Sequence, residues 1–103
     1  MNQIVLIGRL SKINNNEMLR DDTQRRYTRI TLAVHRNYKN ENGEYDTDFI
    51  RIKLIGVVAE NTIEYCKVGD LIGIRGRIET YGKNNTIEII AEKVTFLSTK
   101  KEN

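Results

Sequence analysis

The 103-residue sequence contains no proline and no tryptophan, and it has only one cysteine and one histidine. The single cysteine, Cys66, cannot form an internal disulfide, and one cysteine with one histidine, His35, cannot build a Cys/His zinc site. No apolar run approaches the roughly 20 residues that a membrane-spanning helix needs. The sequence therefore predicts no disulfide scaffold, no metal or other cofactor, and no membrane partner.

Length and charge indicate the class of protein. With 39% hydrophobic residues the chain can bury one modest core, which excludes a two-domain enzyme. Seventeen Lys and Arg against fourteen Asp and Glu give a net charge of +3, a mild preference for anionic partners. We expect one domain over residues 1–98 and a flexible C-terminal end at 99–103. The N-terminus lacks the basic region of a signal peptide, so we expect a cytoplasmic protein.

Hydrophobic periodicity predicts five strands. They span residues 4–10, 25–35, 48–55, 71–81 and 87–96. Alternation assigns to the core side of the second, third and fourth strands Ile30, Leu32, Val34, Ile50, Ile52, Leu54, Ile72, Ile74 and Ile78. The last strand alternates through Ile87, Ile89 and Ala91 and then through Val94 and Phe96. That change of parity near Glu92 and Lys93 predicts a β-bulge.

The segments between the strands predict two hairpin turns and one helix. Asn42-Gly43, within the polar stretch 37–46, is typical of a hairpin turn, and residues 82–85 form a second polar loop. The spacing of Val58, Ile63 and Cys66 predicts two or three helical turns between residues 57 and 67, ended by Gly69.

Five strands with one short helix between the third and fourth match an all-β OB-fold, a five-stranded Greek-key barrel. Gly8, Gly56, Gly73 and Gly76 suit the sharp bends of such a barrel. An open five-stranded sheet is the alternative. The second and third strands of an OB-fold, with the flanking loops, bind oligonucleotides or oligosaccharides.

The polar side of the third predicted strand carries the candidate binding residues. There Phe49 alternates with Arg51 and Lys53, which offers a base a stacking surface and its phosphate a counter-charge. Aromatic and basic residues recur in three other places: Arg36, Tyr38 and Lys39 in the loop after the second strand, Arg75 and Arg77 on the fourth strand, and Tyr81 and Lys83 at the loop after it. We expect these residues to line one groove.

Other readings of the same residues remain open. Alternating Lys and Arg on a strand is most often solvated surface. Phe49 would be a core residue only if the register slipped by one, which would expose Ile50, Ile52 and Leu54. We expect Tyr65 to pack and Cys66 to act as a small buried hydrophobe. Tyr27 and Tyr45 are ambiguous.

No set of residues predicts catalysis. We find no nucleophile with a neighbouring base and no metal-binding set, so an enzyme is not expected. The acidic residues Asp21, Asp22, Asp46 and Asp48 lie among Arg and turn residues and are interpreted as solvated loop charges.

Nearly the whole chain resembles the bacterial-type single-stranded DNA-binding proteins. The resemblance depends on the order and spacing of several stretches, which are 1–10, 30–34, 36–40 with 42–44, 48–51 leading to Gly56, 59–61, 65–69 and 73–78. It implies an OB-fold that assembles into homotetramers, or alternatively dimers, and wraps single-stranded DNA in replication, recombination and repair without catalysing a reaction. It also implies that the protein is associated with the nucleoid.

The resemblance also assigns roles to particular residues. Tyr38 and Phe49 match base-stacking aromatic positions, and Arg51 matches a recurrent phosphate contact. A third aromatic position is Ile55 here, and a fourth matches Lys83, with Tyr81 two residues away as a substitute. Family members usually end in an acidic tip that recruits partners, whereas this sequence ends Lys100-Lys101-Glu102-Asn103, so we expect no tail-mediated recruitment.

Two other functions remain as hypotheses. A primosomal OB-fold protein related to this family would bridge DNA to replication partners. An OB-fold module for protein association alone would use its strand edges as its interface.

Overall fold

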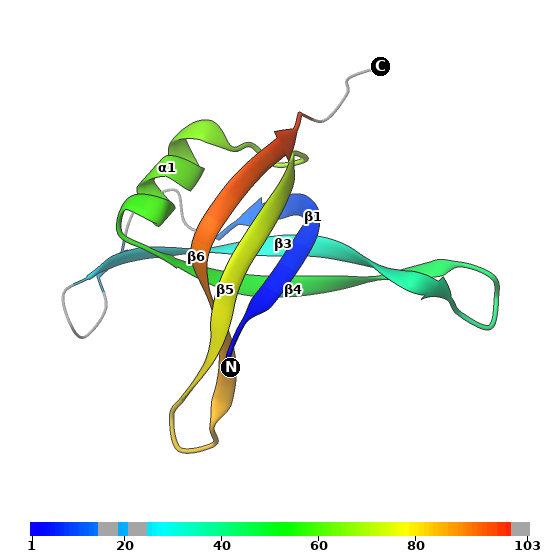
Figure 1. Ribbon diagram of the computed structural model, residues 1–103, viewed down its shortest axis with the longest axis horizontal. Coiled ribbons are helices and arrows are strands. Elements are labelled where there is room, and N and C mark those ends of the chain that lie inside the picture. Colours follow the sequence, from blue (N-terminus) through cyan, green and yellow to red (C-terminus); the bar gives the residue numbers. More distant parts are fainter. Residues whose placement is uncertain (15–18, 21–24, 100–103) are drawn as a thin grey trace.

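The computed structural model describes residues 1–14, 19, 20 and 25–99. These residues form β1 (Ile4–Ile13), β2 (Leu19–Arg20), β3 (Arg26–Lys39), β4 (Tyr45–Ile55), α1 (Val57–Tyr65), β5 (Leu71–Tyr81) and β6 (Thr86–Ser98), as Figure 1 shows. The predicted flexible end at 99–103 lies, apart from residue 99, outside the described residues.

Five of the strands close into a barrel. They are paired in the order β1-β5-β6-β4-β3, and β1 also pairs with β3, for example through Leu10 and Leu32. β4 and β6 run parallel, with Ile52 opposite Ile89. The predicted OB-fold is confirmed, and the β1–β3 pairing excludes the open sheet. The two-residue β2 was not predicted, and because of it the helix lies between β4 and β5 in the observed numbering.

Alternating apolar residues of the strands fill the barrel. The side chains exposed by 1% or less include Leu10, Ile30, Leu32, Ile52, Leu54, Ile72 and Ile74. This set confirms the predicted core faces of β3, β4 and the first half of β5. Each strand contributes every second residue, as the period of two requires.

Alternation failed at the ends of β5 and β6. Ile78 is 38% exposed, so assigning it to the core was wrong. Ile87 and Phe96, which belong to the alternating pattern of the last strand, are 65% and 49% exposed. The β5–β6 hairpin extends past the body of the barrel, where the inward side of a strand has no core to face (Figure 1). Phe96 lies near the other end of β6 and lines a cavity beside α1.

The predicted bulge in β6 is present. Arg75 of β5 is opposite Lys93, but the next residue, Gly76, is opposite Ala91, so Glu92 is the extra residue. The extra residue shifts the alternation of β6 by one position. Ala91 before the bulge and Val94 after it therefore both face the core, as the change of parity in the sequence predicted.

The helix α1 begins after Gly56, whose φ of 63° suits glycine, and ends at Tyr65 rather than at the predicted Gly69. No helix in the described part of the chain is long and apolar enough to span a membrane.

The buried stripe of α1 differs from the predicted one. Ala59 and Thr62 are its buried residues, and Cys66, which follows the helix, is buried as expected. Val58 is only half-buried. Tyr65 is 69% exposed, so the expectation that it packs was wrong. The chain leaves the helix at Cys66, which takes the inward position instead.

Two glycines allow the barrel to close tightly. A Cβ atom on Gly8 would lie 2.3 Å from the carbonyl oxygen of Ala33, and one on Gly76 would lie 2.0 Å from that of Ile90. Both obstacles are backbone atoms of a neighbouring strand, which cannot swing away as a side chain can. At Gly73, also predicted as a bend, the nearest atom to such a Cβ is 3.8 Å away.

The replacement Gly76→Ala should lower the free energy of unfolding by about 2 kcal/mol, because the added methyl group forces β5 and β6 apart. The matched control Gly73→Ala places the same methyl group on the same strand with room for it, and should change stability by less than about 0.5 kcal/mol. Chemical denaturation of both variants measures the difference. Equal losses would contradict the close approach of the two strands.

Candidate nucleic-acid interface

The outer side of the β3–β4 pair carries the predicted binding strand as expected. Phe49 is opposite Ala33, Arg51 opposite Thr31 and Lys53 opposite Arg29. Phe49 is 66% exposed, whereas the alternate residues Ile52 and Leu54 are fully buried. The predicted dry and polar sides of this strand are therefore confirmed.

Closure of the barrel brings two further cations to this side. Arg9 of β1 is opposite Ala33, and Lys12 is opposite Thr31 after a shift of register. Residues directly opposite in a sheet point to the same side. The rows Arg9–Ala33–Phe49 and Lys12–Thr31–Arg51 therefore run across three strands. Sequence reasoning missed both cations because their position depends on the β1–β3 register.

Tyr27 was ambiguous in the sequence and is now placed. It lies on β3 opposite Ile55, and its half-buried ring has two cations over it. The Nζ atom of Lys53 is 4.6 Å from the ring centroid and the Cζ atom of Arg29 is 5.1 Å from it. The alternation around Arg29 could have signalled this second aromatic row. We call the following set the basic face: Arg9, Lys12, Tyr27, Arg29, Phe49, Arg51 and Lys53.

The β5–β6 hairpin meets the basic face at a groove of about 280 Å³. The groove is lined by Arg29, Arg51, Tyr81, Thr86, Ile87 and Glu88. The structure thus brings the predicted residue Tyr81 next to Arg51, although 30 positions separate them in the sequence.

An ion pair lies in this groove. Arg29 Nε donates a hydrogen bond to Glu88 Oε2 at 3.0 Å, and Arg29 NH2 lies 3.0 Å from the same oxygen. Burial disfavours the charged form of Arg29, but hydrogen bonds and charge interactions with Glu88 and Tyr27 outweigh it and raise the pKa of Arg29. Arg29 therefore keeps its positive charge in this groove.

Arg77 and Arg75 lie differently relative to the basic face. Ile90 of β6 is opposite both Lys53 and Arg77, so Arg77 extends that row by two strands. Arg77 is engaged with acids, since its Nε lies 2.8 Å from Glu79 and its NH1 3.5 Å from Glu92.

The exposed Arg75 is opposite Val5 and Lys93, beyond the part of β6 that pairs with β4. The structure does not bring it beside Arg51. The ten predicted residues therefore do not line one continuous groove.

The β3–β4 hairpin projects from the barrel as an arm (Figure 1). β3 continues to Lys39, so Arg36, Tyr38 and Lys39 lie on a strand and not in a loop as predicted. Tyr38 is 61% exposed. Lys39 lies 5.8 Å from the ring of Tyr45, the other tyrosine that was ambiguous in the sequence.

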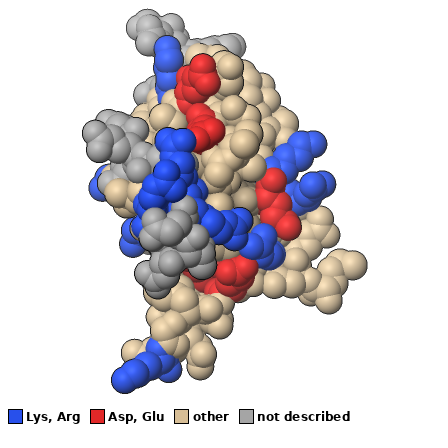
Figure 2. Space-filling view, turned by 90° about the vertical axis from the view of Figure 1, so that its left-hand side faces the viewer, with Lys and Arg blue, Asp and Glu red and all other residues tan. Residues whose placement is uncertain are grey.

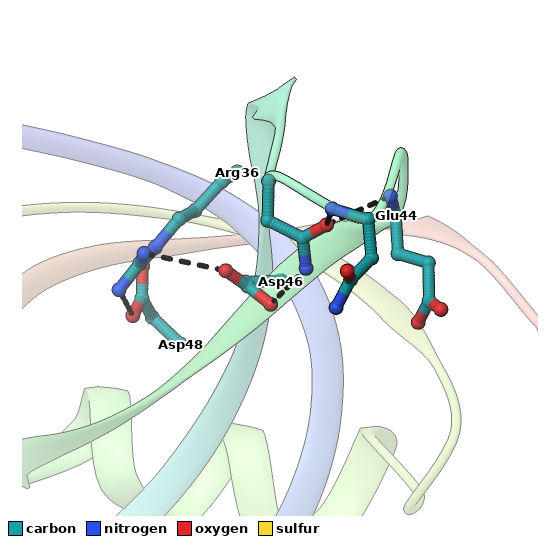
Figure 3. Close-up of polar contacts among 6 residues, drawn as sticks. Arg36, Glu44, Asp46 and Asp48 are labelled. Carbon is teal, nitrogen blue, oxygen red and sulfur yellow. Dashed lines mark hydrogen bonds and ion pairs between the residues drawn. The ribbon is translucent and has the colours of Figure 1, made fainter.

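Arg36 is held by acids on the arm. It donates from Nε and NH2 to the two oxygens of Asp48 at 3.1 and 3.0 Å, and its NH1 lies 3.6 Å from Asp46, as Figure 3 shows. Asp48 precedes Phe49, so strand alternation places this ion pair and the Phe49 ring on opposite sides of the hairpin. Asp46 and Asp48 are thus paired charges, while Asp21 and Asp22 lie outside the described residues.

Asn40 fixes the tip of the arm. Its Oδ1 accepts hydrogen bonds from the backbone N–H groups of Asn42 and Glu44, and its Nδ2 donates to Asp46 (Figure 3). Gly43, with φ of 78°, completes the turn predicted at this position. The arm therefore holds Tyr38 at a defined place relative to the barrel.

Charges of both signs are mixed on the surface. On the side shown in Figure 2, Lys and Arg side chains gather across the middle, with Asp and Glu side chains beside them. Among the described residues, none of the ion pairs involves Arg51 or Lys83. Lys83 lies exposed in the turn between β5 and β6.

A second cavity of about 330 Å³ lies between α1 and β6. The residues lining it include Val58, Tyr65, Cys66, Val94 and Phe96. None of the residues of the basic face lines this cavity.

A closed OB-fold barrel with an exposed ring among cations outside β3 and β4 is typical of modules that bind single-stranded nucleic acid. Comparison with known proteins gives the family: the model of the single-strand binding protein family matches residues 1–97. The chain belongs to this family.

Three similar relatives are bacterial. Single-stranded DNA-binding protein 1 of Clostridium acetobutylicum is 38% identical, over 99% of this chain and 98% of the relative. Single-stranded DNA-binding protein B of Bacillus subtilis is 36% identical, over 96% of this chain and 92% of the relative. The single-stranded DNA-binding protein of Streptococcus mutans is 35% identical, over 97% of this chain but only 64% of the relative.

A similar solved structure is a deletion mutant of the single-stranded DNA binding protein from Thermus aquaticus. It has a TM-score of 0.69 and 24% identity, and the match covers 95% of this chain and 51% of that one. This likeness supports the fold.

The Arg36–Asp48 pair makes the arm sensitive to acid. Hydrogen bonds from Arg36 lower the pKa of Asp48 most; burial opposes this, and the charge of Arg36 adds to the lowering, so the net shift is downward. Because the folded-state pKa is lowered, the pair stabilises the arm above the ordinary pKa of aspartate, and this is lost as the pH falls through the lowered value.

In an NMR titration of the side-chain carboxyl groups, Arg36→Gln should raise the pKa of Asp48 toward its ordinary value. Lys39→Gln removes a neighbouring cation that does not contact Asp48 and should leave that pKa unchanged. An Asp48 pKa that is the same in the wild type and in Arg36→Gln would contradict the ion pair.

Proposed function

We propose that this protein binds single-stranded DNA without catalysing a reaction, and that the basic face is its main binding surface. The observation that carries the proposal is the exposed Phe49 ring, in one row with Arg9 and next to the row of Arg51. Exposure alone does not single out Phe49, but an exposed ring beside cations supplies both contacts that single-stranded nucleic acid needs.

Single-stranded DNA offers the two groups that this surface can bind. An unpaired base stacks on an aromatic ring, and the phosphate next to it is attracted to a nearby cation. Every base has a π-face, so stacking on Phe49 does not select a sequence. Arg51 is assigned the phosphate, because no acidic side chain among the described residues pairs with it.

The other predicted residues are proposed in three roles. Tyr38 and Lys39 extend the stacking surface along the arm, and Tyr81 and Lys83 extend it along the β5–β6 hairpin. Arg36, which is held by Asp48, positions the arm. Arg77 extends the row of Lys53. A bound DNA strand reaches Arg75 only by bending around the barrel.

Stacking surfaces are few on this protein, so charge has a large share in binding. The sequence has no Trp, and Ile55 offers no ring, although Tyr27 lies directly opposite it. Neutralised phosphates release counterions, so log K should fall by about 0.7 per phosphate contact for each tenfold rise in salt.

The cellular role follows from such binding. We propose that the protein coats and protects single-stranded DNA in replication, recombination and repair, in the cytoplasm. Self-association into a homotetramer, with a dimer as the alternative, is supported by two exposed apolar side chains on β1, Val5 and Ile7, exposed by 67% and 58%.

Replacing Phe49 tests the binding surface. Phe49→Ala should weaken binding to oligo(dT) by about 1–3 kcal/mol, the value of one stacked base. Tyr65→Ala is the matched control, because it removes a similarly exposed ring from α1, away from the basic face. Fluorescence anisotropy of labelled oligo(dT) measures both affinities.

Two results of this experiment would contradict the proposal. Equal affinities of the two variants would show that the basic face is not the binding surface. If the wild-type protein does not bind oligo(dT) even at low salt, the proposed function itself is wrong.

A further inference from the structure

The groove between the basic face and the β5–β6 hairpin has walls of different chemistry. Tyr81 and Ile87, exposed by 55% and 65%, supply apolar surface, and Arg51 supplies a cation. At about 280 Å³ the groove lies just below the range of about 300–1,000 Å³ that is usual for drug-sized ligands. A single nucleotide of a bound strand is a ligand of suitable size.

The Arg29–Glu88 pair gives the groove a polar but neutral wall. The side chain of Glu88 is only 16% exposed and that of Arg29 26%. Because the two charges cancel, this wall neither attracts nor repels a phosphate strongly. It can still exchange hydrogen bonds with the uncharged edge of a base.

The carboxylate of Glu88 has one oxygen outside the ion pair. Both contacts with Arg29 end on Oε2, and Oε1 takes part in neither. A carboxylate oxygen accepts hydrogen bonds and cannot donate them. A base that presents an amino group to Oε1 is therefore favoured, and a base that presents a carbonyl oxygen is disfavoured.

We propose that this groove is a subsite for one nucleotide and that Glu88 makes it prefer cytosine to thymine. Arg51 binds the phosphate, Tyr81 stacks on the base, and Glu88 Oε1 accepts a hydrogen bond from the base. Cytosine carries the N4 amino donor where thymine carries the O4 acceptor. Thymine also differs from cytosine in its C5 methyl group and in the hydrogen on its N3, so the contribution of Glu88 is isolated by comparing variants on each oligonucleotide. The inference rests on the proposed function.

Glu88→Gln tests the subsite through the ratio of two affinities. The variant should bind oligo(dC) about threefold to tenfold more weakly than the wild type, because a hydrogen bond to a charged acceptor is replaced by a weaker one. Its affinity for oligo(dT) of the same length should stay within about twofold or rise, since the amide can donate to O4. For each oligonucleotide the affinity of the variant is compared with that of the wild type. Any intrinsic difference in affinity between oligo(dC) and oligo(dT) therefore cancels.

Glu79→Gln is the matched control. Glu79 is directly opposite Glu88 in the β5–β6 pairing, but it does not line the groove. The Glu79→Gln substitution removes the same charge from the neighbouring strand and should change the affinities for oligo(dC) and oligo(dT) equally. Glu88→Asp keeps the charge but shortens the side chain, and it should lose the preference as Glu88→Gln does. This second variant decides the question if Glu88→Gln does not fold.

The outcomes separate this inference from the proposed function. Equal changes for oligo(dC) and oligo(dT) would show that Glu88 acts only through its charge and would overturn the subsite. Unchanged affinities for both would also overturn it. If the wild-type protein binds neither oligonucleotide, the failure is that of the proposed function.

Discussion

The contact on which the rest of the structure depends is the pairing of β1 with β3, where Gly8 lies against the backbone of Ala33. This pairing closes the barrel and sets the core. It also places Arg9 in the row of Phe49 and Lys12 in the row of Arg51. Without closure, the basic face would consist only of Tyr27 and Phe49 with the cations of β3 and β4. With it, three strands form a single charged surface.

Acidic partners decide which cations on this surface can meet a phosphate. Arg36, Arg77 and Arg29 each contact carboxylates, at 3.0 Å or less for the nearest atoms. The net charge of +3 therefore says little about where an anion binds. Arg51 forms no ion pair with the described residues and is central to the basic face. Polar contacts also stabilise the arm that carries Tyr38: Asp48 accepts a hydrogen bond from Arg36, and Asn40 accepts one from the backbone of Asn42.

Sequence pattern predicted most of this fold because alternation is strict where a strand faces a core. Alternation predicted which sides of β3 and β4 face the core. It also predicted the bulge at Glu92 and the exposure of Phe49. Alternation failed at Ile78, and Ile87 is exposed too, because the β5–β6 hairpin extends beyond the core. The expectation that Tyr65 packs failed because the helix ends there. The site was only partly predictable, since the places of Arg9, Lys12 and Glu88 depend on cross-strand register, which no local pattern contains.

The central claim is that single-stranded DNA binds the exterior of β1, β3 and β4. The most direct test is to map backbone amide chemical shifts while oligo(dT) is added at low salt. The account predicts that shifts concentrate around Phe49, Arg51 and Ala33 and on the β5–β6 hairpin, with little change in α1. Shifts concentrated at the cavity between α1 and β6, with the β3–β4 pair unchanged, would contradict it.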